Sequence, residues 1–112
     1  MTAWNSRHNA SPNALYRHGD VLIRQIASLP AGVQRRSGAT LAHGEATGHR
    51  HQMQPAQAVQ LWERNGELFL EVIGASASLV HEEHRTIELP RGLYRVWKQR
   101  EYRPEAYIEV ED

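Results

Sequence analysis

The chain has 112 residues, and its 13 basic and 13 acidic side chains give a formal net charge of zero. This length suits one compact domain and is too short for two of ordinary size. The balanced charge does not indicate nucleic acid as a partner. Because there is no cysteine, disulfides, thiolate metal sites and cysteine nucleophiles are excluded, and any metal must be bound by histidine, carboxylate or backbone oxygen.

Residues 1–14 are the first predicted segment. They are rich in asparagine, serine and alanine and can bury little apolar surface, so we expect a flexible N-terminal arm followed by a single β domain over residues 15–112. No apolar run approaches the roughly 20 residues of a membrane span, and the N-terminus lacks the apolar segment of a signal peptide. We therefore expect a cytoplasmic protein that is not associated with a membrane.

The next elements are predicted to be short strands separated by turns. The β-branched run 21–26 is the first clear strand. Asn-Gly at positions 65–66, between two apolar runs, predicts a hairpin with strands near residues 58–63 and 67–73. Pro-Arg-Gly at positions 90–92 predicts a second hairpin between strands in 85–89 and 93–99. A last short strand is expected at 106–110.

No apolar helical periodicity persists long enough to predict a helix. We therefore expect an all-β fold, a small single-domain barrel or sandwich of roughly seven or eight strands.

Three histidines lie close together at His43, His49 and His51. Gly44 and Gly48 bracket the residues between them, which predicts a turn joining a strand that ends near His43 to one that begins near His49. Side chains two apart on a strand share a face and lie about 7 Å apart. His49 and His51 can therefore converge on one metal ion.

A second histidine cluster lies at His81 and His84, so that five of the seven histidines fall between positions 43 and 84. The predicted hairpins can bring the two clusters together, where four imidazoles would fill a tetrahedral site or three would leave one position open. Residues three apart on a straight strand face opposite sides. Both histidines can bind only if the chain bends at Glu82 and Glu83; otherwise the segment is an exposed charged turn.

The motifs G-D-V-L at 19–22, G-E-x-T-G-H-x-H at 44–51 and H-E-E-H to Q-R-E-Y at 81–102 resemble an uncharacterised family of small bacterial and phage-associated proteins. This resemblance covers roughly residues 19–110 and implies no established activity.

The His-x-His pair and the Pro-x-Gly segment also resemble those of cupins, small β-barrels that hold a metal in the mouth of the barrel. The resemblance implies a histidine-lined barrel with His49 and His51 as a ligand pair. Cupins have a glutamate a few residues after this pair, where this chain has Gln54, Pro55 and Ala56. The second cupin motif has a histidine after its Pro-x-Gly turn, whereas here His81 and His84 precede Pro90 and Gly92. The resemblance therefore does not imply oxygenase chemistry.

Other candidate residues have less support from the sequence. Glu45 could fix a histidine tautomer or act as a catalytic general base beside a metal-bound water, and His43 could be a further ligand. His8 and His18 lie in or near the arm and are expected to be incidental. The segment around positions 100–102 could bind an anion or a base, although the sequence favours an amphipathic strand in which Trp97 packs while the charges reach water.

The sequence therefore predicts a β-barrel that binds a divalent transition metal through His49, His51, His81 and His84, with His43 and Glu45 nearby. Zinc suits an all-imidazole site best, while nickel, copper, iron and manganese also accept imidazole. The expected chemistry is metal-assisted hydrolysis or another reaction on a small-molecule ligand. Alternatives are a metal-free phosphodiesterase with histidine as acid and base and a non-enzymatic oligomeric interaction module. An amphipathic small barrel is also expected to form a homo-oligomer.

Overall fold

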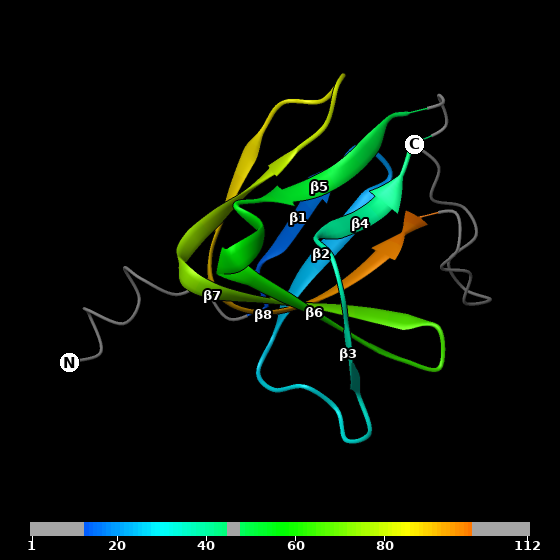
Figure 1. Cartoon of the computed structure of the whole chain (residues 1–112), viewed down its shortest axis with the longest axis vertical. Coiled ribbons are helices and arrows are strands. Elements are labelled where there is room, and N and C mark those ends of the chain that lie inside the picture. Colours follow the sequence, from blue (N-terminus) through cyan, green and yellow to red (C-terminus); the bar gives the residue numbers. More distant parts are fainter. Residues whose placement is uncertain (1–12, 45–47, 100–112) are drawn as a thin grey trace.

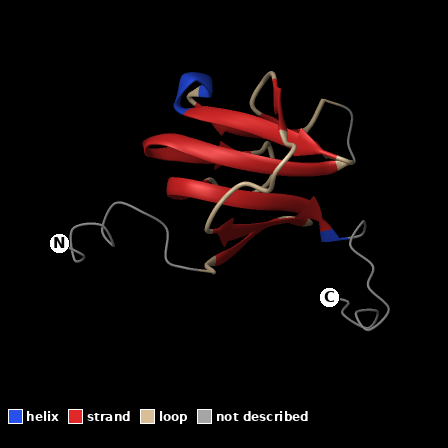
Figure 2. Cartoon of the chain, turned by 90° about the horizontal axis from the view of Figure 1, so that it is seen from below, coloured by secondary structure: helices blue, strands red, loops and turns tan. Residues whose placement is uncertain are grey.

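The computed structural model describes residues 13–44 and 48–99. This part of the chain forms one antiparallel sheet of eight strands, shown in Figures 1 and 2. The strands are β1 (Leu15–His18), β2 (Val21–Ile26), β3 (Gln34–Arg36), β4 (Thr40–His43), β5 (Arg50–Gln54), β6 (Val59–Arg64), β7 (Glu67–Val80) and β8 (Ile87–Lys98), with a 3-10 turn, η1 (Ala56–Ala58), before β6. The predicted all-β fold is confirmed.

The two longest strands, β7 and β8, organise the sheet. β8 pairs with β7 and, through its C-terminal half, with β2, beyond which lies β1. The N-terminal half of β7 pairs with β6, beyond which lies β3. The C-terminal half of β7 pairs with β5, beyond which lies β4. The sheet curls (Figure 1) but does not close into a barrel, because β1 and β4 stand at opposite ends of the strand order.

The hairpin predicted at Asn65 and Gly66 is confirmed. Both residues have positive φ, 49° and 79°, and they join β6 to β7. Positive φ at both central residues gives a two-residue turn the twist that antiparallel strands require.

The second predicted hairpin, at positions 90–92, is wrong. β8 runs through these positions without a break, and the chain reverses at residues 81–86 instead. Opposite them the register of β7 shifts between Val72 and Ser76, so three residues of β7 face one of β8. Proline cannot donate a hydrogen bond to the ladder and is tolerated at such a bulge. Pro90 and Gly92 therefore mark a bulge within a continuous strand.

The concave side of the sheet carries the hydrophobic core. Alternate residues of β7 and β8 point into it, and Leu70, Leu79, Leu89 and Tyr94 have no exposed surface. β5 contributes Met53 to this core, and the same face of β5 carries the buried His51. The hydrophobic core therefore ends at a buried imidazole, that of His51.

Several sequence predictions lie outside the described residues: most of the N-terminal arm, Glu45, positions 100–102 and the strand at 106–110. Asn13 and Ala14, the last residues of the expected arm, are hydrogen-bonded to Gln25 of β2. Within the described ranges, no helix is long and apolar enough to cross a membrane.

Candidate metal centre

Five histidine side chains gather at one end of the sheet, between β1, the start of β5 and the connection from β7 to β8. The ring centroids lie 4.4 Å apart for His51 and His81, 4.5 Å for His81 and His84, and 5.0 Å for His18 and His51. His49 is the fifth member, 5.6 Å from His81. Strand pairing explains the convergence, because β5 runs beside the last residues of β7 and His81 directly follows that strand.

The bend needed to bring His81 and His84 together is present. β7 ends at Val80, and the next residues leave the strand. The backbone N–H of Glu83 donates a 3.0 Å hydrogen bond to Nδ1 of His81, which holds the chain in this bend. The sequence predicted that His81 and His84 can reach one site only if the chain bends between them, and the structure has this bend.

Two groups of side chains could hold a metal ion. One ring nitrogen from each of His51, His81 and His84 lies within 4.8 Å of the other two. Two nitrogens bound to one tetrahedral zinc ion are about 3.4 Å apart, so metal binding requires only a modest contraction of this group. The second group, His49, His81 and Glu82, meets the same 4.8 Å limit and is more exposed.

Two glycines allow the backbone to approach the cluster. A Cβ atom at Gly19 would lie 2.5 Å from Nε2 of His84, and one at Gly44 would lie 3.0 Å from Nε2 of His81. A side chain at position 19 would displace His84, and one at position 44 would crowd His49 and His81. Gly19 of G-D-V-L and Gly44, the first glycine of G-E-x-T-G, therefore form part of the wall of the site.

His18 is a member of the site that the sequence did not reveal. It was expected to be incidental, and this is wrong: only 2% of its surface is exposed, and its Nδ1 lies 2.9 Å from Nδ1 of His51. The sequence contained one signal that His18 is held in the fold: it directly precedes Gly19 and Asp20. These two residues form a tight turn that pairs His18 with Val21 at the end of the β1–β2 ribbon.

Burial lowers the pKa of both His18 and His51. For His51, loss of solvent is the largest cause, the neighbouring His81 and His18 lower the pKa further, and Asp20 opposes them, so that the pKa falls to about 4. For His18, burial outweighs the opposing effect of its hydrogen bond to the backbone carbonyl of Arg85. Both imidazoles are therefore neutral at pH 7.

The hydrogen bonds of this neutral pair fix its tautomers. A carbonyl oxygen can only accept, so His18 Nε2 carries the proton in its 2.9 Å contact with the Arg85 oxygen. Nδ1 of His18 then accepts a hydrogen bond from Nδ1 of His51. Nε2 of His51 is left without a proton, which is the state that a metal ligand requires.

Carboxylates lie around the cluster. An oxygen of Asp20 is 3.9 Å from Nε2 of His51, and one of Glu83 is 3.7 Å from Nδ1 of His49. Hydrogen bonds from its own backbone N–H and from that of Arg50 lower the pKa of Glu82. These acidic groups favour a cation at the site.

The remaining predicted residues are placed differently. His43 is exposed at the end of β4, opposite Arg50, and belongs to neither of the two groups within the described residues. His49 belongs to the more exposed group and is not grouped with His51. The roles of His43 and His49 as ligands stay predictions, and Glu45 lies outside the described residues.

Comparison with known proteins identifies the family. Residues 17–99 match a family described as a domain of unknown function (DUF8820), and the chain belongs to that family. Neither the curated proteins nor the solved structures gave a match. The resemblance to cupins stays an expectation.

Proposed function

We propose that this member of the family binds one divalent transition-metal ion, with zinc preferred, through His51, His81 and His84. The observation that carries the proposal is the convergence of ring nitrogens of His51, His81 and His84 within 4.8 Å of one another. The hydrogen bonds of buried His51 support it, because they leave its Nε2 without a proton. His51 is buried, His81 is half-buried and His84 is exposed, so the group reaches from the core edge to the surface. One metal ion could be bound by all three imidazoles.

The composition of the group supports zinc and an open coordination position. Imidazole is a good zinc ligand, and three protein ligands with one free position are typical of catalytic zinc sites, whereas structural sites have four. A bound zinc ion would supply Lewis acidity and lower the pKa of a water molecule. Metal-assisted hydrolysis of a small molecule is therefore the chemistry that we propose for this position.

His81 must change its hydrogen bonding when the ion binds. Coordination through Nδ1 would use the lone pair that now accepts from the Glu83 N–H, and coordination through Nε2 would put the proton on Nδ1. Either mode breaks this bond. We therefore expect the bend at residues 81–86 to rearrange locally on metal binding.

The two alternative functions have less support. A metal-free acid–base pair needs one protonated and one neutral imidazole in contact with substrate. His18 and His51 are both held neutral and are 2% and 1% exposed, so they do not fit that requirement. An interaction module does not explain why five imidazoles converge, with two of them, His18 and His51, buried.

The test is metal analysis of protein purified without an affinity tag, followed by zinc titration of the chelator-treated protein. We expect about one equivalent of zinc per chain, with binding lost in His51→Ala, His81→Ala and His84→Ala. Zinc should also raise the melting temperature of the wild type, because it binds only the folded chain. His43→Ala is the matched control, since His43 is exposed and outside both groups.

Two results would contradict the proposal. One is a wild-type protein that binds neither zinc, nickel nor manganese. The other is undiminished binding after loss of His51, which would move the site to the group of His49, His81 and Glu82.

A further inference from the structure

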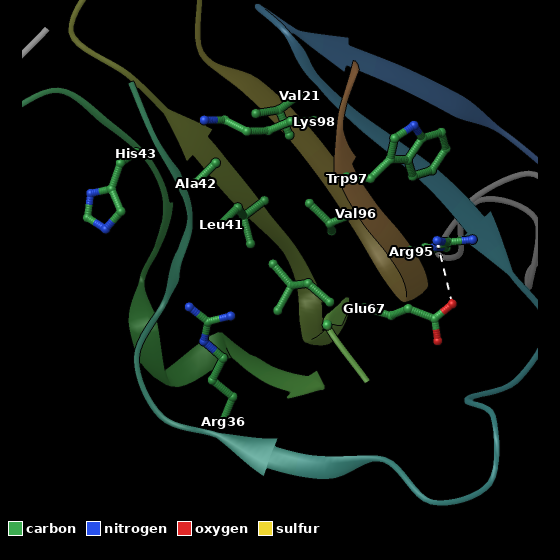
Figure 3. Close-up of a pocket in the computed structure, with 12 residues that line it drawn as sticks. Val21, Arg36, Leu41, Ala42, His43, Glu67, Arg95, Val96, Trp97 and Lys98 are labelled. Atoms are coloured by element: carbon green, nitrogen blue, oxygen red, sulfur yellow. Dashed lines mark ion pairs between the residues drawn. The ribbon is translucent and has the colours of Figure 1, made fainter. Parts of the chain in front are cut away.

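A cavity of about 400 Å³ opens where the curled sheet fails to close, between the C-terminal end of β8, β4 and the turn from β6 to β7. Its apolar lining includes Val21, Leu41, Leu68 and Val96, which are buried or nearly so. Figure 3 shows Leu41 and Val96 in the middle of this region. None of the five clustered histidines lines the cavity. It is therefore a separate feature of the molecule.

Two cationic side chains share the concave face with this apolar lining. Lys98 alternates with the buried Tyr94 and Val96 along β8 and pairs with Val21, so it stands on the core side of the strand. Arg36 is paired with the buried Leu61 and stands on the same side. In Figure 3 they flank Leu41 and Val96 from opposite sides.

The charge of the lining is unbalanced. Arg36, Arg95 and Lys98 are cationic, while Glu67 is the only carboxylate in the described lining. Glu67 forms ion pairs with two arginines, because its two oxygens lie 3.6 Å from Arg95 and 3.2 Å from Arg64. Among the described residues, Arg36 forms one ion pair, a 3.8 Å contact with Glu63 in which both side chains are about half exposed.

Lys98 is the only lysine of the chain. Its side chain makes no hydrogen bond or ion pair with the other described residues, while its backbone pairs with Val21 in the sheet. A cation on the core side of a sheet is costly without a counter-charge. Among the described residues, the cationic groups of this lining therefore outnumber the acidic ones, which favours an anionic ligand.

We infer that this cavity binds a small organic anion, with its phosphate or carboxylate held between Lys98 and Arg36 and its apolar body on Leu41, Val96 and Val21. Arginine offers paired N–H donors that match such oxyanions, and lysine adds a point charge. Concave, mostly apolar sites with a few convergent polar groups are typical of small-molecule sites.

The pocket adjoins the histidine cluster through two strands. Ala42, in its wall, is paired with His51 across β4 and β5, and Val21 directly follows Asp20. The pocket and the candidate metal centre are therefore built in part on the same pair of strands, β4 and β5. The inference stands without the metal, because the cations and the apolar lining do not depend on it.

The experiment uses 1-naphthyl phosphate as the probe, titrated into the full chain in the presence of a chelator. We expect saturable binding that Lys98→Gln and Arg36→Gln each weaken about tenfold, the value of one charge-assisted hydrogen bond. 1-Naphthol, which lacks the anion, should bind far more weakly. Arg24→Gln is the matched control, because Arg24 is an exposed arginine of β2 outside the cavity.

Amide chemical shifts of the wild type give a second readout that needs no variant. The probe should move the signals of Leu41, Val96 and Lys98 more than those of the exposed Ile73. Absence of saturable binding, equal binding of 1-naphthol, or wild-type affinity in both glutamine variants would overturn the inference. So would binding that disappears in His51→Ala and persists in Lys98→Gln, since the anion would then be held by the histidines. Because the chelator is present throughout, failure here leaves the zinc titration unaffected.

Discussion

A single buried histidine, His18, controls the state of another. Its Nε2 donates to a backbone carbonyl, its Nδ1 accepts from His51, and this chain of hydrogen bonds leaves the far nitrogen of His51 free of a proton. Groups that orient a ligand in this way commonly matter almost as much as the ligand itself. His18 is thus a positioning residue for the proposed metal ion.

His18→Ala should weaken zinc binding by about 10- to 100-fold, because His51 Nδ1 loses its acceptor and the required tautomer is no longer fixed. Competition against a chromophoric chelator measures this change. His18→Asn, whose side-chain oxygen can accept from His51 Nδ1, should recover part of the affinity. Equal affinity in His18→Ala and wild type would show that the tautomer of His51 does not depend on His18.

Among the elements, the tight turn between β1 and β2 has two roles. It pairs His18 with Val21, which starts the ribbon, and it passes so close to His84 that only glycine fits at position 19. Gly19 has φ of 65°, in the left-handed region where a Cβ atom is unfavourable. The turn therefore shapes both the strand pairing and the metal site.

Gly19→Ala and Gly66→Ala separate these two roles. Each places alanine at a positive φ and should lower the free energy of unfolding of the metal-free protein by about 1 kcal/mol. A Cβ at Gly66 meets nothing within 4 Å, whereas one at Gly19 displaces His84. Only Gly19→Ala should therefore lose zinc affinity. Denaturant unfolding and zinc titration of the two variants test this, and unaltered zinc binding in Gly19→Ala would contradict the placement of His84.

At the scale of the whole molecule, the curl of the sheet brings β1, β5 and the connection between β7 and β8 close together, although these segments are far apart in the sequence. The site is completed only when these distant segments are folded together, so its protonation is coupled to global stability. His18 and His51 are neutral in the folded chain, while in the unfolded chain histidine titrates near pH 6.5. The unfolded state consequently binds more protons below that pH.

The free energy of unfolding of the metal-free protein should therefore fall as the pH falls below about 6.5, by up to about 1.4 kcal/mol per pH unit for each histidine, and for His51 this continues to its folded pKa of about 4. Above this window the contribution is fully present. Urea unfolding across the range, in chelator, measures the slope. The double variant His18→Ala/His51→Ala should show a smaller slope, whereas His43→Ala should not. A wild type that gains stability on acidification through this window would disprove the neutral pair.

The expected homo-oligomer and cytoplasmic location also belong to this scale and stay predictions. Leu15 and Ile73, each 51% exposed, are the large apolar side chains that the described surface presents to solvent. They lie on β1 and β7.

The sequence by itself determined the features that depend on neighbours along the chain. The strand at 21–26, the turn at Asn65 and Gly66, and the need for a bend between His81 and His84 follow from side-chain alternation and from the φ angles that turn residues favour. Tertiary structure alone decided the rest. The bulge at Pro90, the role of His18 and the cationic cavity depend on which strands lie side by side and in which register, and pairing between distant segments leaves little local signal.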